Sequence, residues 1–343
     1  MVILHTSATP AGGLPASAAA PGGDALVGAS LFVSSLEQSI AFLHGAFGFQ
    51  LVASLEQEAW PRAVLATAST SGSSGLALGS LAPGSASMAE GAEVAGAARG
   101  LGHFTLAVPD ASAAVALLKS SGYGSLVLDE CSAVIPVRAH GQSHTDRTAR
   151  VRDIDGHTWQ LIELSSGKVR ERLCSIMIHV SDLNASLPWY TGVLGMLVHQ
   201  RYESRETGYL SALVGYGAEL ECTLLELRQQ WQPQVPAHAP PQQPPQQAAA
   251  DAAGVLASLA RQAPPPPQRL CRLLVRTRSL GAAAERLQAL GQPFERLQLA
   301  GAEDPTVAAE ALAVADADGW RFCFVGGGAQ QGGGDDAAVG MEE

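Results

Sequence analysis

The stretch "VSDLNASLPWYTGVLGM" (residues 180–196) repeats an earlier part of the same chain, "VSSLEQSIAFLHGAFGF" (33–49). Val, Ser, Leu, Ser, Gly and Gly stand at matching places, and most other positions exchange one apolar residue for another. Self-similarity of this kind indicates that one structural unit occurs twice in the chain.

Both copies predict an amphipathic helix. Their apolar residues recur at i, i+4 and i+7, which is one face of a helix: Leu36, Ile40 and Leu43, and then Leu183, Leu187 and Tyr190. Ser35 and Asp182 are residue types that cap helix N-termini. Gly48 and Gly195 are placed to end the helices. Pro188 is awkward in the second helix, and it is tolerable only if that helix starts late enough to leave the proline near the first turn.

Four units of about 55–70 residues account for most of the chain, and the two copies open the first and the third of them. Each unit begins with a short apolar strand, continues into a helix and ends in strands. Asp-Gly pairs at 155–156 and 318–319 predict hairpin turns before the last strands of the second and fourth units. We therefore predict an α+β fold built from a duplicated pair of βαβββ modules.

Length and composition limit the possible classes of protein. A chain of 343 residues that is 47% hydrophobic suits two domains with sizeable cores. The net charge of −11 argues against nucleic-acid and anionic-membrane partners, both of which call for basic patches. No stretch approaches the roughly 20 apolar residues that span a bilayer. We expect a monomer, because four fused modules can close their interfaces internally.

The location of the protein is expected to be cytoplasmic. The first basic residue is Arg62, whereas secretory signals open with positive charge and transit peptides are rich in Arg. This expectation holds unless residues upstream of Met1 are missing. Cysteines occur without CxxC spacing, which favours reduced thiols; they are Cys131, Cys174, Cys222, Cys271 and Cys323.

Three segments lack periodicity, and we expect them to be disordered. They are an N-terminal segment (1–24), a Pro/Gln-rich spacer (229–268) and a Gly-rich tail (326–343). Between them we predict one domain over 25–167, which holds the first two modules. A second domain over 168–325 holds the other two modules and includes the spacer.

Several stretches resemble the glyoxalase I family of the vicinal-oxygen-chelate superfamily. They are "MIHVSDLNASLPWYTGVLGM" (177–196), "LLELRQQW" (224–231), "RGLGHFTLAVPD" (99–110) and the two Asp-Gly strand endings. The resemblance is to the plant-type form, in which two vicinal-oxygen-chelate domains are fused. It implies metal-dependent isomerisation of the methylglyoxal–glutathione hemithioacetal to lactoylglutathione, with one divalent ion, Ni²⁺ or Zn²⁺.

The chemistry implied by this resemblance explains which residue types a site needs. A divalent ion polarises the two adjacent oxygens of the substrate and so stabilises an enediolate. A carboxylate beside the metal moves a proton between neighbouring carbons. Imidazole, carboxylate and carboxamide oxygen are all suitable ligands for such an ion.

The resemblance implies two ligand positions in each module, one on the first strand and one on the last. The first-strand positions are Gly28, His103, Ser175 and Arg272, and the last-strand positions are Ala77, Gln160, Glu226 and Cys323. Modules one and four therefore offer no metal site. Modules two and three offer His103, Gln160 and Glu226 as metal ligands, with Glu226 as the catalytic base. Ser175 is placed to orient a metal-bound water.

Two other carboxylates are excluded by the alternation of side chains along a strand. Glu163 lies three residues after Gln160 and therefore faces the other way. The same alternation favours Glu226 over Glu221 as the ligand of the third module.

Three further residues are implied to hold the substrate. Arg99 stands four residues before His103, where the family has an Arg that clamps a glutathione carboxylate. Gln230 stands where the family commonly has an Asn. His179 replaces a family Arg and shares a face with Ser175, so we expect it to line the pocket; a packed or rim histidine is the alternative.

The resulting prediction is a glyoxalase I-like lactoylglutathione lyase with at most one intact site. Gln160 stands where the family expects a Glu, and an amide nitrogen cannot accept a proton at neutral pH. Losing a proton-transfer group typically costs about 10²–10⁴ in rate. The alternative is a non-catalytic pseudoenzyme that binds glutathione conjugates or another small anion without metal. An extradiol dioxygenase is disfavoured, because Ser175 and Arg272 replace the histidines it needs.

Overall fold

The protein is represented by a computed structural model. It describes residues 24–54, 63–66, 74–80, 100–137, 144–163, 171–204, 208–217, 221–230, 270–299 and 309–326. Most of the two termini and of the spacer lies outside these ranges. Strand β12 ends at Gln230, so residues 229 and 230 belong to a sheet and not to the spacer.

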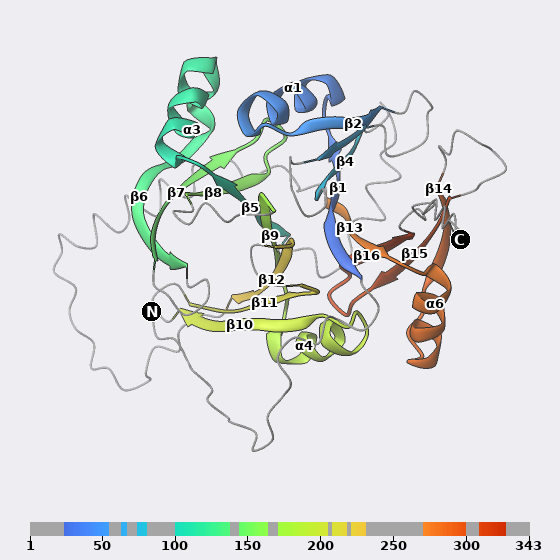
Figure 1. The fold of residues 1–343 in the computed structure, drawn as a ribbon. Helices are drawn as coiled ribbons and strands as arrows, with labels where there is room; N and C mark the ends of the chain where they lie inside the picture. The colour runs from blue at the N-terminus through green and yellow to red at the C-terminus, as the bar shows by residue number, and fades with distance from the viewer. Residues whose placement is uncertain are drawn as a thin grey trace, which may run out of the picture.

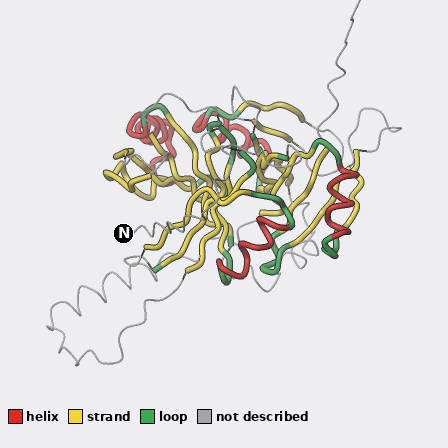
Figure 2. The backbone as a smooth tube through the Cα atoms, turned by 60° about the horizontal axis from the view of Figure 1, so that its bottom comes forward, coloured by secondary structure: helices red, strands yellow, loops and turns green. Residues whose placement is uncertain are grey.

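Two eight-stranded sheets form the centre of the molecule, with the helices on the outside (Figures 1 and 2). The first sheet has the order β10-β11-β12-β9-β5-β8-β7-β6. Its strands are β5 (Leu101–Val108), β6 (Val127–Val137), β7 (His144–Arg152), β8 (Thr158–Glu163), β9 (Leu173–His179), β10 (Leu197–Ser204), β11 (Tyr209–Gly215) and β12 (Leu224–Gln230).

The second sheet has the order β14-β15-β16-β13-β1-β4-β3-β2. Its strands are β1 (Ala25–Val33), β2 (Gln50–Ser54), β3 (Ala63–Ala66), β4 (Gly75–Ser80), β13 (Leu270–Thr277), β14 (Glu295–Leu299), β15 (Ala309–Ala315) and β16 (Arg321–Gly326). Each first strand is followed by one helix: α1 (Leu36–Phe47), α3 (Ala111–Leu118), α4 (Leu183–Gly192) and α6 (Leu280–Ala289). The four predicted βαβββ modules are thus confirmed.

Each sheet combines modules from both halves of the chain. In the first sheet, β5 of the second module pairs antiparallel with β9 of the third. In the second sheet, β1 of the first module pairs antiparallel with β13 of the fourth. The predicted boundary at residue 167 follows chain order, whereas the sheets cross it. Ligand positions of the second and third modules therefore share one sheet.

The helix ends follow the sequence prediction closely. Ser35 and Asp182 accept hydrogen bonds from backbone N–H groups in the first turns of α1 and α4. Gly48 takes a left-handed conformation, with φ of 70°, and its N–H bonds back into α1.

Pro188 does not lie in the first turn of its helix, which is the place where the sequence analysis would tolerate it. It lies inside α4, which begins at Leu183 and continues past it to Gly192. Proline cannot donate the helical hydrogen bond at this position. The helix persists because the side chains of Leu187 and Tyr190, on either side of the proline, are buried in the core.

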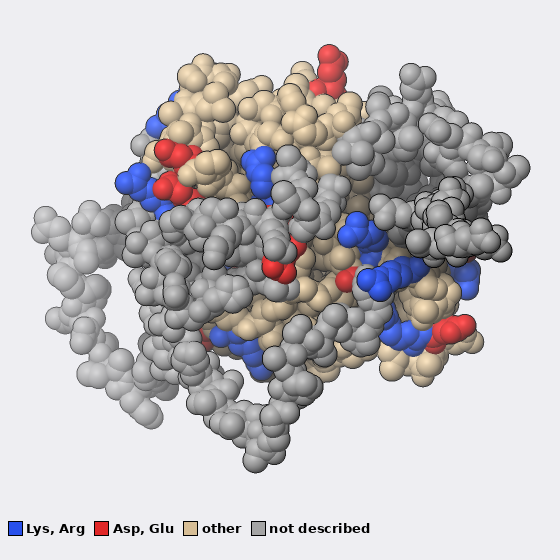
Figure 3. Space-filling view, viewed as in Figure 1, with Lys and Arg blue, Asp and Glu red and all other residues tan. Residues whose placement is uncertain are grey.

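Charged side chains of both signs occur on the face of the molecule in Figure 3, in keeping with a mixed surface of acidic net charge. None of the helices in the described ranges has the length and apolar character required to span a bilayer.

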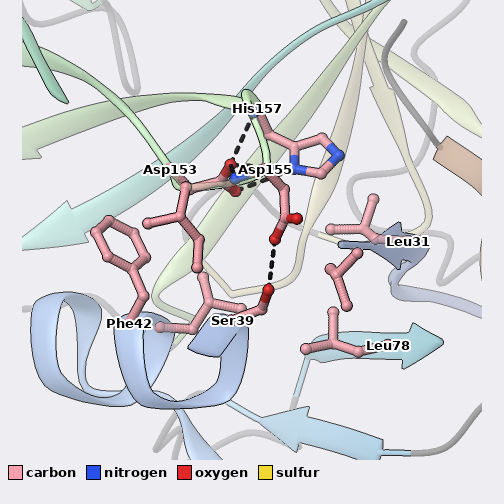
Figure 4. A pocket seen from close by; sticks show the side chains of 10 residues that line it. Leu31, Ser39, Phe42, Leu78, Asp153, Asp155 and His157 are labelled. Atoms are coloured by element: carbon pink, nitrogen blue, oxygen red, sulfur yellow. Dashed lines mark hydrogen bonds and ion pairs between the residues drawn. The ribbon is translucent and has the colours of Figure 1, made fainter. Parts of the chain in front are cut away.

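A pair of aspartates explains why the serines of the opening motif are repeated. Asp155 accepts hydrogen bonds from the backbone N–H and Oγ of Ser34, both at 2.7 Å, and from Oγ of Ser39 at 2.5 Å. These contacts fix α1 of the first module against the Asp-Gly turn of the second. Figure 4 shows the Ser39 contact beside a small cavity whose other walls are mainly apolar side chains of β1, α1 and β4.

The second half of the chain repeats this contact. Asp318 accepts from the backbone N–H and Oγ of Ser181, at 3.1 and 2.5 Å, and from Oγ of Ser186 at 3.2 Å. The duplicated motif is therefore first of all a docking element. It holds the helix of one module against the turn of the next, while the sheets join the two halves.

Candidate functional site

The ligand positions of the second and third modules have the same register in the first sheet. Gln160 pairs with the residue two after His103. Glu226 pairs with the residue two after Ser175. The two modules therefore present their first-strand and last-strand positions in equivalent places.

The second sheet follows the same rule. Ala77 pairs with the residue two after Gly28, and Cys323 with the residue two after Arg272. All four modules thus share this register, and the side chains at the two positions differ from module to module.

One face of the first sheet carries all the candidate donors of modules two and three. The flanking residues on the same strands are fully buried in the core, and among them are Phe104, Ile176, Leu225 and Trp159. Because strand side chains alternate, His103, Gln160, Ser175 and Glu226 point to the opposite face. We call this the polar face; Arg228, two residues after Glu226, also belongs to it.

The alternative carboxylates lie elsewhere, as alternation along the strands requires. Glu163 accepts a hydrogen bond from the backbone N–H of Ala111 at the start of α3, 3.1 Å away, and so faces the helix layer. Glu221 is exposed in the turn before β12.

Glu226 is held by four hydrogen bonds to its Oε1 atom. Tyr202 Oη on β10 donates at 2.6 Å, and Ser211 Oγ on β11 donates at 2.7 Å. Arg228 donates from Nε at 3.0 Å and from Nη2 at 2.5 Å. The guanidinium of Arg228 also lies over the ring of Tyr209, 4.2 Å from its centroid.

The sequence alone did not predict this network. The position of Arg228 was open to prediction, since residues two apart on a strand share a face. Tyr202 and Ser211 were not, because only the register of β10 and β11 brings them beside Glu226.

The charges of this cluster follow from burial and pairing. Burial raises the pKa of Glu226, but Arg228, His103 and the hydroxyl donors outweigh it and lower the pKa overall, so the group is a carboxylate. The same ion pair raises the pKa of Arg228 against the effect of burial. Burial, followed by the charge of Glu226, raises the pKa of Tyr202 well above its ordinary value, so the phenol keeps its proton.

His103 is a neutral imidazole at neutral pH. Burial lowers its pKa to about 4, and although Glu226 opposes this change, Arg228 and Arg150 add to it. His179 lies four residues after Ser175 on β9, so alternation puts it on the polar face, and it adds slightly to the lowering of the His103 pKa. His179 ends β9, and its backbone carbonyl accepts from Trp320 Nε1 at 2.8 Å.

Gln230 and Gln160 lie further from the centre of this cluster. Gln230 is exposed at the end of β12, on the polar face by alternation from Glu226. Arg99 lies outside the described residues. Gln160 is half-buried on β8, opposite Arg150 of β7.

A divalent metal does not fit the residues present in this arrangement. His103 is a suitable neutral donor, but Ser175 and Gln160 contribute no charge. The charge of Glu226, the one anionic donor in the predicted set, is already offset by Arg228. In the described ranges, no group of three or more His, Cys, Asp or Glu side chains is arranged to hold a metal ion. His103, Gln160 and Glu226 do share one face of the sheet, but metal binding by these three residues stays a prediction.

The corresponding positions of the second sheet are even less suited to binding a metal ion. Gly28 and Ala77 carry no donor. The Arg272 side chain hydrogen-bonds to Cys323, and burial raises the pKa of that thiol although Arg272 partly offsets the change. A thiol that keeps its proton beside a guanidinium is a poor metal ligand.

Comparison with known proteins identifies the class. The family model of the Glyoxalase/Bleomycin resistance protein/Dioxygenase superfamily matches residues 25–161 and 172–324. The chain therefore belongs to this superfamily, as its module order and its paired strand positions indicate.

Among known sequences, the chain is similar to lactoylglutathione lyases. It is 32% identical to lactoylglutathione lyase GLX1 of Arabidopsis thaliana over 128 residues, which are 37% of this chain and 41% of that protein. It is 43% identical to the lactoylglutathione lyase of Salmonella typhimurium over 60 residues, 18% of this chain and 44% of that one. Each match thus spans less than half the length of the relative.

Among solved structures, the fold is similar to that of glyoxalase I from Zea mays. The TM-score is 0.61 at 20% identity, over 88% of this chain and 92% of that one. A putative dioxygenase from Bacillus subtilis matches with a TM-score of 0.51 at 9% identity, over 88% and 84% of the two chains. At these identities the likeness establishes the fold.

Proposed function

We propose that this glyoxalase I-like protein binds a small anionic ligand of the glutathione-adduct class at the polar face of the first sheet, without a metal ion and without lactoylglutathione lyase turnover. The single observation that carries the proposal is the ion pair of Glu226 with Arg228, 2.5 Å long and largely buried. In this ion pair the negative charge of Glu226, which a metal ion would need, is balanced by the guanidinium of Arg228.

The choice of ligand is supported by the relatives and by the groups around the polar face. The similar sequences are named lactoylglutathione lyases, so a glutathione adduct is the natural first ligand to test. Arg150 offers an exposed guanidinium on the strand beside Gln160, although it also pairs with Asp129. The exposed amide of Gln230 lies at the end of β12. Both groups suit carboxylates of a tripeptide.

A second candidate is the lactoylglutathione lyase itself. The observation in its favour is that a neutral His103 and an ionised Glu226 share one face of one sheet. In this reading His103, Gln160 and Glu226 hold the metal and Glu226 is the base, while Arg99, Gln230 and His179 hold the tripeptide. It requires the pair between Glu226 and Arg228 to open.

The experiment that separates the two candidates uses the full chain. Protein stripped with a chelator is titrated with an S-alkylated glutathione in a calorimeter. It is then incubated with Ni²⁺ or Zn²⁺ and assayed for metal content and for lactoylglutathione. We expect binding by the metal-free chain, no bound metal and no turnover above buffer. One metal per chain together with lactoylglutathione formation would establish the lyase instead.

A further inference from the structure

Arg228 is fixed in place from several sides. Two of its nitrogens donate to Glu226 Oε1, and its guanidinium stacks on the ring of Tyr209. The ring of Tyr209 in turn meets the ring of Tyr202 edge to face, with centroids 6.0 Å apart. Only 20% of the Arg228 side chain is exposed. This is a built contact, unlike a surface ion pair between two mobile side chains.

The carboxylate that Arg228 contacts has to be balanced by a cation. Glu226 is 5% exposed, and a buried charge is strongly destabilising unless it is paired and hydrogen-bonded. Tyr202 and Ser211 supply hydrogen bonds but no charge. In a metal centre the ion supplies the positive charge; here the chain supplies it two residues away on the same strand.

We propose that Arg228 takes the place of a divalent cation at Glu226 and, as a positioning residue, keeps the polar face free of metal. A guanidinium and a divalent ion on one carboxylate repel each other, so the two occupants exclude one another. This inference rests on the proposed function and extends it, because it names the residue that decides between metal-free binding and metal binding. It follows that a neutral residue at 228 opens the site to a divalent ion.

The second sheet also has an arginine beside a last-strand position. There Arg272 stands at the first-strand position itself, and its side chain hydrogen-bonds to Cys323 at the last-strand position. Each sheet thus places an arginine beside a last-strand position, although the two arginines come from different places in their modules.

The test compares Ni²⁺ binding by the wild-type full chain and by Arg228→Gln. The expected result is that Arg228→Gln binds one Ni²⁺ per chain, with an affinity roughly tenfold or more above that of the wild type. The gain should disappear in the double variant Arg228→Gln/His103→Ala. Arg201→Gln is the matched control, since Arg201 is exposed on β10 and bonds only to Asn184 among the contacts of its side chain that we describe; it should behave as the wild type.

A second measurement keeps the test decisive if Arg228→Gln is unstable. Removing the arginine leaves Glu226 buried without its cation, so the variant is expected to melt at a lower temperature. Added Ni²⁺ should then raise the Tm of Arg228→Gln and leave that of the wild type unchanged, because a ligand that binds the folded state stabilises it. A Tm that does not respond to Ni²⁺ in the variant overturns the inference.

Stoichiometric Ni²⁺ binding by the wild type that is lost in His103→Ala also overturns it. Failure of the proposed function is read separately, from the binding of S-alkylated glutathione to chelator-treated wild type. If chelator-treated wild type does not bind S-alkylated glutathione, the proposed ligand is wrong. The comparison of Ni²⁺ binding by the wild type and Arg228→Gln still decides the role of Arg228.

Discussion

Arg228 and Glu226 lie two residues apart on β12, and the guanidinium of the first donates two hydrogen bonds, at 3.0 and 2.5 Å, to a single oxygen of the second. Residues two apart on a strand share a face, so the pair is formed within one strand. The carboxylate that the superfamily fold presents at a last-strand position is thereby already neutralised. The superfamily scaffold is thus present in this chain, and the pairing of Glu226 with Arg228 is the observation on which the proposed loss of metal binding depends.

Tyr202→Phe tests how far the hydroxyl donors support this carboxylate. The variant removes the 2.6 Å hydrogen bond to a buried charged group, so we expect the free energy of unfolding to fall by about 1.5–3 kcal/mol. Urea denaturation measures the change. Tyr123→Phe is the control, because Tyr123 contacts Phe42 through its ring and should lose little. Equal stability of Tyr202→Phe and the wild type would contradict the network.

Asp155→Ala tests the docking of the first helix on the second module. Three hydrogen bonds end on this carboxylate, and its removal leaves the donors of Ser34 and Ser39 without their acceptor. We expect a loss of about 2–3 kcal/mol in the free energy of unfolding. Asp129→Ala breaks an exposed ion pair with Arg150 and should cost less than about 1 kcal/mol. If Asp155→Ala and Asp129→Ala lower the free energy of unfolding by the same amount, Asp155 is not a docking residue.

Pro188→Ala should stabilise the protein. Pro188 is exposed inside α4, so the substitution removes no buried side chain and restores a helical N–H donor. A gain of about 1–3 kcal/mol in the free energy of unfolding is expected, reduced somewhat because proline also restricts the unfolded chain. Thermal and urea denaturation both report it. A less stable variant would mean that α4 depends on the proline.

Alkaline pH should destabilise the fold through its buried phenols. Burial is the largest cause of the raised pKa of Tyr190, Tyr202 and Tyr216, whereas tyrosine in the unfolded chain titrates near pH 10. Because the folded pKa is the higher one, the stability from the neutral phenols is complete below about pH 10. It is lost above that pH, by about 1.4 kcal/mol per pH unit for each phenol.

Denaturation at a series of pH values, with phenolate absorbance followed in parallel, checks this prediction. The absorbance of these three groups should appear only as the protein unfolds. Titration of all five tyrosines together in the folded protein, near pH 10, would contradict it.

The scaffold was predictable from the sequence because it depends on local patterns. The repeated motif, its helical spacing and the caps at Ser35 and Asp182 located the modules, and strand alternation assigned Glu163 to the helix layer and Glu226 to the polar face. Pro188 was misjudged because tertiary burial of its neighbours outweighed the local preference.

The hydrogen bonds that Glu226 receives from other strands were not predictable in the same way. The two hydroxyl donors of Glu226 come from β10 and β11, and the sequence does not state which residues those strands place beside β12. The module positions implied by the resemblance pointed to the carboxylate, and the spacing along β12 could have added Arg228. Tyr202 and Ser211 could not be added, because they depend on the register of β10, β11 and β12. Residue type at a ligand position therefore did not determine whether that residue is available to a metal.

Metal-free binding at the polar face is tested by the metal content of purified wild-type protein after dialysis against Ni²⁺, with lactoylglutathione formation and S-alkylated glutathione binding measured on the same sample. We expect no bound Ni²⁺, no turnover and binding of the glutathione adduct. One Ni²⁺ per chain, lost in His103→Ala and in Glu226→Ala and accompanied by turnover, would contradict it.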